Sequence, residues 1–136
     1  MREELKGPKV ENVAVAVVQQ DGEDNEKVYN VYLLNLRDDI MEGIIVSSRG
    51  YGQSLTTGEK IQTSMLRHKI EVLMPNQAAK IEPIMEDVFG LSNEYWVSFL
   101  IGNQLFDKKF VFVPEAISPS NMKKIPVLGD IGVIIM

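Results

Sequence analysis

The residues best suited to catalysis or metal binding are scarce in this chain. Its 136 residues include one histidine, His68, and no cysteine. A protein zinc site needs three or four ligands, most of them histidine nitrogens or cysteine sulfurs, so the composition does not supply one. The lack of cysteine also rules out disulfides and thiol nucleophiles. We therefore predict that the protein uses neither a metal ion nor a cofactor.

His68 is the side chain that a small hydrolytic enzyme would have to use as its base. Ser64 and Ser98 are the serines that we consider as its nucleophile, but no local motif marks either one as activated. The simpler interpretation places His68 at the core edge of a strand, with one ring nitrogen hydrogen-bonded. An enzyme built around His68 is therefore the weakest functional alternative.

A glycine-rich segment provides better candidates for binding. Arg49 and Tyr51 lie beside Gly50 and Gly52, at the start of a stretch over 50–59 that we predict to be a loop. The glycine spacing fits neither a dinucleotide fingerprint nor a phosphate loop. Because loops carry binding residues disproportionately, Arg49 and Tyr51 are candidate contact residues.

Two predicted strands add further candidates. Arg67 and Lys69 share one face of a strand, as a basic RNA-binding face would require, although protection of an edge strand by charge explains them as well. Trp96 either fills the second face of a central strand, which we favour, or anchors an interface. His68 lies on the face opposite Arg67, so it is a candidate of a separate kind.

Acidic residues outnumber basic ones, 19 to 14, which gives a net charge of −5 and a pI near 4.9. Glu86, Asp87 and Glu94 would have to face one another in a cleft to act as general acid and base, and a solvated acidic turn is the simpler interpretation. Glu86 is kept as a candidate binding residue. The negative charge repels polyanions, which disfavours a nucleic-acid partner without excluding it.

Alternating apolar patterns predict strands through most of the chain. Residues 10–20 are apolar on both faces, which predicts a central strand, and a polar turn connects them to a second strand at 28–36. Gly102-Asn103 predicts a two-residue hairpin turn. Further strands are predicted at 43–49, 61–73, 79–82, 95–101, 106–113 and 131–136.

The short strand at 79–82 directs Ala79 and Ile81 to one face, and Lys80 and Glu82 to the other. One short helical turn is predicted over 84–92.

About seven antiparallel strands with short turns predict an all-β fold, an immunoglobulin-like β-sandwich. A small β-barrel has the same periodicity and is the alternative. We predict a single domain over 1–136, with a flexible N-terminus at 1–9, an irregular proline-containing segment at 114–130 and a C-terminal strand at 131–136. The first residues lack the apolar run of a signal peptide, so we expect a cytoplasmic protein without a membrane partner.

Four segments carry a resemblance to known proteins: Ser-Ser-Arg-Gly-Tyr-Gly at 47–52, Leu-Arg-His at 66–68, Pro-Ile-Met-Glu-Asp-Val-Phe-Gly at 83–90 and Glu-Tyr-Trp-Val-Ser-Phe at 94–99. They resemble a small, uncharacterised bacterial family in which some members are labelled as related to phenylalanyl-tRNA synthetase. The resemblance covers nearly the whole chain. Its label implies a tRNA- or synthetase-associated module.

Two functional hypotheses of different classes follow. The first is a non-enzymatic cytoplasmic interaction domain that binds a protein partner or itself, since an unpaired apolar strand at 131–136 is a template for a homodimer. The second is a tRNA-associated module that uses Arg49, Tyr51, Arg67 and Lys69, whose binding would weaken steeply with salt.

Overall fold

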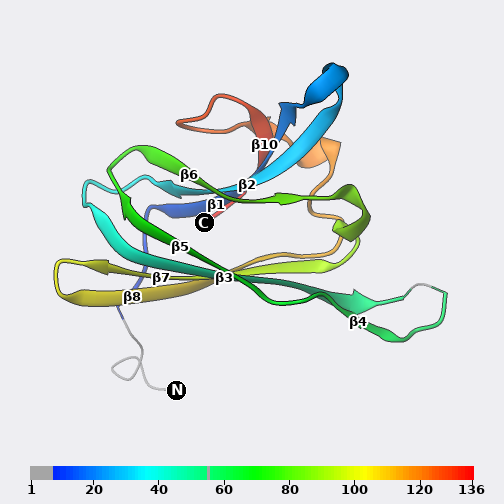
Figure 1. Ribbon diagram of the computed structural model, residues 1–136, viewed down its shortest axis with the longest axis horizontal. Helices are drawn as coiled ribbons and strands as arrows, with labels where there is room; N and C mark the ends of the chain where they lie inside the picture. The colour runs from blue at the N-terminus through cyan, green and yellow to red at the C-terminus, as the bar shows by residue number, and fades with distance from the viewer. Residues whose placement is uncertain (1–7, 55) are drawn as a thin grey trace.

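Within residues 8–54 and 56–136, which the computed structural model describes, ten strands form two antiparallel sheets that face each other (Figure 1). Sheet A has the strand order β6-β2-β1-β10-β9; sheet B has the order β4-β3-β7-β8, with β5 also paired to β3. The strands are β1 (Val13–Asp21), β2 (Lys27–Asn35), β3 (Met41–Gln53), β4 (Lys60–Gln62), β5 (Leu66–Leu73), β6 (Gln77–Ile84), β7 (Ser92–Ile101), β8 (Gln104–Phe112), β9 (Lys123–Lys124) and β10 (Ile131–Ile135).

The predicted all-β sandwich is confirmed, and the barrel alternative is wrong because the two sheets do not close into one. Both predicted hairpins are present. β1 pairs with β2 along its full length. β7 and β8 are joined by Gly102-Asn103, where Gly102 has the positive φ of 58° that a tight hairpin turn requires.

Two apolar clusters lie on opposite faces of sheet A. The main core fills the space between the sheets and includes Tyr95, Phe99 and Phe112. The second cluster lies on the outer face of sheet A, where Ala14 and Ile125 belong to one buried group. This arrangement explains why β1 is apolar on both faces: each face is covered by other parts of the chain.

The glycine-rich segment differs from its prediction as a loop. β3 continues through it to Gln53 and pairs with β4, so Gly50 and Gly52 belong to a strand. A Cβ atom on Gly52 would lie 2.9 Å from Leu91 Cδ2. Glycine is therefore needed here for close packing and not for a turn.

The predicted strand at 61–73 is broken into β4 and β5. The residues between them include Thr63, whose hydroxyl accepts a hydrogen bond from the amide of Gly50 at 2.7 Å. The strand interruption moves the chain away from regular pairing with β3 at this point, which leaves room for a cavity described below.

The helical turn predicted at 84–92 is a three-residue 3-10 turn, η3 (Glu86–Val88). β6 runs through Pro83 to Ile84 and does not stop before the proline. β6 is an edge strand of sheet A, where the missing N–H of proline is tolerated. Other 3-10 turns in the described residues are η2 (Glu23–Asn25) and η4 (Pro119–Asn121).

The C-terminal strand β10 pairs within its own chain. It is antiparallel to β1, from Val15 opposite Ile135 to Val18 opposite Gly132. A Cβ on Gly132 would lie 2.2 Å from the carbonyl oxygen of Val17, so glycine permits this close approach. The other side of β10 pairs with β9 at two positions.

The segment predicted as irregular, 114–130, contains only η4 and the two residues of β9 as regular structure. Most of the predicted flexible N-terminus, 1–7, lies outside the described residues.

Candidate functional site

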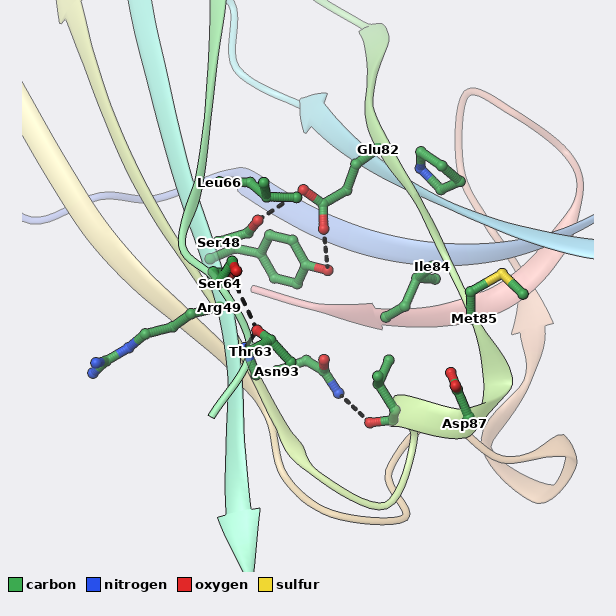
Figure 2. A pocket seen from close by; sticks show the side chains of 14 residues that line it. Ser48, Arg49, Thr63, Ser64, Leu66, Glu82, Ile84, Met85, Asp87 and Asn93 are labelled. Atoms are coloured by element: carbon green, nitrogen blue, oxygen red, sulfur yellow. Dashed lines mark hydrogen bonds between the residues drawn. The ribbon is translucent and has the colours of Figure 1, made fainter. Parts of the chain in front are cut away.

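A carboxylate lies between the two sheets, where Glu82 extends from β6 toward sheet B (Figure 2). Its Oε1 atom accepts hydrogen bonds from Ser48 Oγ and His68 Nε2, each at 2.7 Å. The hydroxyl of Tyr95 is 3.5 Å from the other oxygen, Oε2. The side chain of Glu82 is 13% exposed. We call Ser48, His68, Glu82 and Tyr95 the Glu82 network.

The sequence pattern places Glu82 on the same face of the strand as Lys80, and this prediction is wrong. Val31 pairs with Glu82 and Tyr32 pairs with Lys80, so Ile81 is an extra residue that interrupts the register. Such a bulge reverses the alternation of side chains beyond it. Glu82 is therefore directed inward. The strand contains no glycine or turn residue that would indicate the bulge from the sequence.

Tyr95 forms the inner side of the network. Its ring is 2% exposed and packs edge-to-face against Phe112 at 6.2 Å. Burial raises the pKa of Tyr95 well above its usual range, and the nearby negative charge of Glu82 raises it further. Tyr95 consequently keeps its proton and presents a hydroxyl to the carboxylate.

A cavity of about 260 Å³ lies beside the Glu82 network. Figure 2 shows it between β6 and η3 on one side and the connection from β4 to β5 on the other. The carboxylates of Glu82 and Asp87 both line it. Arg49 also contributes atoms to its wall, but its side chain points away from the network, as Figure 2 shows.

The arrangement of Ser48 and His68 does not match a serine nucleophile with a histidine base. Both side chains contact the same oxygen of Glu82, which lies between them. A catalytic triad needs the histidine between the serine and the carboxylate. Of the serines considered from the sequence, Ser64 lines the cavity, while Ser98 alternates with buried Val97 and Phe99 and so lies on the outer face of sheet B.

A second candidate site is the outer face of sheet B. Arg67 on β5, Ser47 on β3, Trp96 on β7 and Lys109 on β8 form one cross-strand row. Arg49 and Tyr51 continue the same face of β3, since side chains alternate along a strand. We call these six residues the Trp96 face.

Trp96 is 48% exposed. The favoured prediction that it is buried is wrong, because no described segment covers this face of β7. The alternative, an exposed position, is what the structure has.

Charged side chains surround Trp96 at short range. Glu94 is 3.0 Å from Arg49 and 3.7 Å from Lys109, and its side chain is 7% exposed. The same two cations lie over aromatic rings: Arg49 is 5.2 Å from the centre of Tyr51, and Lys109 is 5.0 Å from the centre of Trp96. Each of these aromatic rings therefore has a cation over one of its faces.

The candidate residues chosen from the sequence lie in three separate places: the Trp96 face, the Glu82 network and a hollow lined by Glu86. Arg49, Tyr51, Arg67 and Trp96 share the Trp96 face, whereas His68 lies inside in the Glu82 network.

Glu86 belongs to neither group. It lines another hollow, together with Tyr29 and Met85. Of the three acidic residues considered as paired carboxylates, Glu94 lies apart, beside Arg49 on the outer face of sheet B. Asp87 lines both the cavity and this hollow, whereas Glu86 lines the hollow but not the cavity.

Across residues 8–54 and 56–136, no group of three or more His, Cys, Asp or Glu side chains is arranged to hold a metal ion. Over the same range, no helix has the length and apolar character needed to cross a bilayer. Comparison of the chain with protein-family models, curated proteins and solved structures finds no match. The resemblance to the synthetase-labelled family stays a prediction.

Proposed function

We propose that the protein is a non-enzymatic interaction domain that binds a protein partner through the Trp96 face. The observation that supports this proposal most directly is the exposure of Trp96, at 48%, on the outer face of sheet B. Tryptophan, tyrosine and arginine are the residues that most often dominate the binding energy of protein interfaces. The Trp96 face holds all three types.

The charges on this face favour an acidic partner. Arg49, Arg67 and Lys109 lie around Trp96, and the carboxylate among them, Glu94, is almost fully covered. Glu94 pairs with both Arg49 and Lys109, so one negative charge is shared by two of the three cations. A partner that supplies carboxylates would therefore meet an excess of positive charge here, although the chain as a whole has a net charge of −5. Such local complementarity accelerates association and selects among partners.

A single-stranded RNA, such as part of a tRNA, is the second candidate because cations and aromatic rings lie on one sheet face. Base stacking needs an open ring face. The ring faces of Tyr51 and Trp96 are already approached by Arg49 and Lys109. The protein partner is therefore the better-supported candidate.

A second copy of the chain is one possible protein partner. The proposed route is pairing through β10, whose inner side is occupied by β1 and whose other side is paired with β9 only at Ile131 and Gly132. Light scattering of the full chain over a wide concentration range tests this route, with a concentration-dependent dimer as the expected result. A chain cut at Gly129 is not a suitable control, since it would lose a strand of sheet A.

Site-specific photo-crosslinking tests the proposed face. A photoreactive amino acid at position 47, in place of Ser47 beside Trp96, is expected to capture a discrete partner in the cells that express the protein. The matched control carries the same amino acid at position 80, where Lys80 is exposed on sheet A. Capture at position 47 only, and loss of it in Trp96→Ala, supports the proposal.

Reconstitution with the purified partner then completes the test. Trp96→Ala should weaken binding by about 30-fold or more, as for a typical hot-spot residue, and Arg67→Glu should weaken it through charge reversal. Equal capture at positions 47 and 80, or unchanged affinity in Trp96→Ala, would contradict the proposal. An adduct that ribonuclease removes would identify RNA as the partner instead.

A further inference from the structure

We propose that the cavity beside the Glu82 network binds a small organic ammonium ion, a protonated primary amine on a short apolar body. This site shares only Arg49 with the Trp96 face, and it does not depend on the partner proposed there. The two are on opposite faces of sheet B: Tyr95 and Ser48 point inward, while the neighbouring Trp96 and Ser47 point outward.

The charge of the cavity wall selects a cation. Glu82 and Asp87 contribute carboxylates to the lining, and Arg49 is the one lysine or arginine among the described lining residues. The guanidinium of Arg49 is not available to balance them, because it pairs with Glu94 at 3.0 Å on the outer face. A cation that enters the cavity therefore meets negative charge in a partly buried setting, where electrostatic attraction is stronger than in water.

One oxygen of Glu82 is only weakly hydrogen-bonded within the protein. Its Oε1 already accepts two short hydrogen bonds, from Ser48 and His68. Its Oε2 has only the hydroxyl of Tyr95 at 3.5 Å, which is beyond the usual length of an O–H···O hydrogen bond. An ammonium group has three N–H donors, so it can satisfy Oε2 directly.

The remaining polar groups of the cavity are largely used within the protein. The side-chain amide of Asn93 donates to the carbonyls of Val88 and Leu91, and the hydroxyl of Thr63 is bonded to the backbone of Gly50 and Ser64. These groups offer little to an anionic or strongly polar ligand. Oε2 of Glu82 is the weakly hydrogen-bonded acceptor of the cavity. It favours a ligand that donates hydrogen bonds.

The size and lining of the cavity limit the rest of the ligand. Apolar side chains of Leu66, Ile84, Met85 and Val88 form much of the wall. At about 260 Å³, the cavity lies below the range of roughly 300–1,000 Å³ that holds drug-sized ligands. A short alkyl chain fits these dimensions, whereas a nucleotide does not.

The test uses n-butylammonium as the probe, with n-butanol and butyrate as neutral and anionic controls of the same chain length. Each is titrated into the full-length protein and followed by amide chemical shifts in NMR. The expected result is saturable shifts with butylammonium, concentrated at Ser48, Ser64, Leu66, Glu82 and the residues from Ile84 to Val88. Butanol is expected to bind at least about tenfold more weakly, because its hydroxyl carries no charge and forms no ion pair with Glu82.

Two substitutions and one matched control locate the charge. Glu82→Gln keeps the shape of the side chain and should weaken butylammonium binding by about tenfold or more. Asp87→Asn should weaken it by a smaller factor. Glu86→Gln removes an equal charge from the same 3-10 turn, at a residue that lines the other hollow, and should leave binding unchanged.

The outcomes separate clearly. If Glu82→Gln fails to fold, two measurements still test the proposal. They are the comparison of Asp87→Asn with Glu86→Gln, and the binding of the three probes to the natural protein. Equal binding of butylammonium and butanol would overturn the proposal, as would no saturable shifts at the cavity or equal weakening by Asp87→Asn and Glu86→Gln. If Trp96→Ala still binds butylammonium, the amine site is independent of the Trp96 face, whatever the outcome of the partner-binding test.

Discussion

The outer faces of the two sheets differ in what lies on them. On sheet A, the small side chains of Ala14 and Ala16 lie in a buried cluster with Ile125, which comes from the segment between η4 and β10. On sheet B, the corresponding surface carries Trp96 and charged side chains, and no described segment crosses it. One sheet therefore has two covered faces, and the other has one.

This difference follows from side-chain size and charge. Alanine on β1 lets the covering segment approach closely, and isoleucine from that segment fills the space above it. Arginine, lysine and tryptophan on sheet B are too large and too charged to be covered in this way without a partner that pairs them. The outer face of sheet A contributes to stability, whereas the outer face of sheet B is available for binding.

The largest expected effect comes from removing the cover of sheet A. Ile125→Ala should lower the free energy of unfolding by about 2–5 kcal/mol, because Ile125 is 1% exposed and its removal leaves a cavity against β1. Urea denaturation measures the change. The matched substitution on sheet B is Leu105→Thr, at an exposed position of β8, with an expected change within about 0.5 kcal/mol. Similar losses of unfolding free energy in Ile125→Ala and Leu105→Thr would contradict the difference between the outer faces of the two sheets.

The sequence contains most of the information for the strands, and for good reason. An apolar pattern on both faces of β1 predicts two layers of cover, and both are present. Gly102-Asn103 specifies a tight turn through local backbone preference alone. Such features depend on neighbouring residues, so they can be predicted without tertiary structure.

The candidate sites depend on contacts that the sequence does not reveal. The bulge at Ile81 redirects Glu82, although strict alternation predicts that it faces solvent. Gly52 is needed because the side chain of Leu91, which is distant in the sequence, packs closely against it. From the sequence alone, this glycine indicates a loop. Trp96 has the sequence environment of a buried residue, and its exposure results from the absence of a covering segment over this part of sheet B in the described chain.

A smaller effect should distinguish the two faces of β7 by pH. The pKa of Tyr95 is raised in the folded protein, above the value of about 10 that tyrosine has when unfolded. The stabilisation is therefore complete below pH 10 and is lost as the pH rises further, because the unfolded chain releases the proton first. The contribution to the slope should approach about 1.4 kcal/mol per pH unit.

Urea denaturation between pH 8 and pH 11 measures this slope. Tyr95→Phe should reduce it, since phenylalanine has no proton to release. Trp96→Phe, the adjacent substitution on the outer face of β7, should leave it unchanged. A slope that Tyr95→Phe does not alter would show that burial and the charge of Glu82 do not raise the pKa of Tyr95 as expected.

The smallest expected effect is a change in fluorescence quenching and not in stability. It reports the charge of the Trp96 face. Trp96 is the one tryptophan of the chain, so its fluorescence reads a single position. Relative to the quenching of free tryptophan by each ion, iodide should quench it more efficiently than caesium, because Lys109 lies 5.0 Å from the ring centre and attracts anions.

Lys109→Gln should reduce quenching by iodide and increase quenching by caesium, since it removes the cation and leaves the charge of Glu94 less compensated. Lys80→Gln on sheet A is the control, and it should change neither value. Added potassium chloride should shrink the difference between the two quenchers as it screens the charges. Weak quenching by both ions would mean that Trp96 is covered, and the contrast between the two sheets would then fail at its central residue.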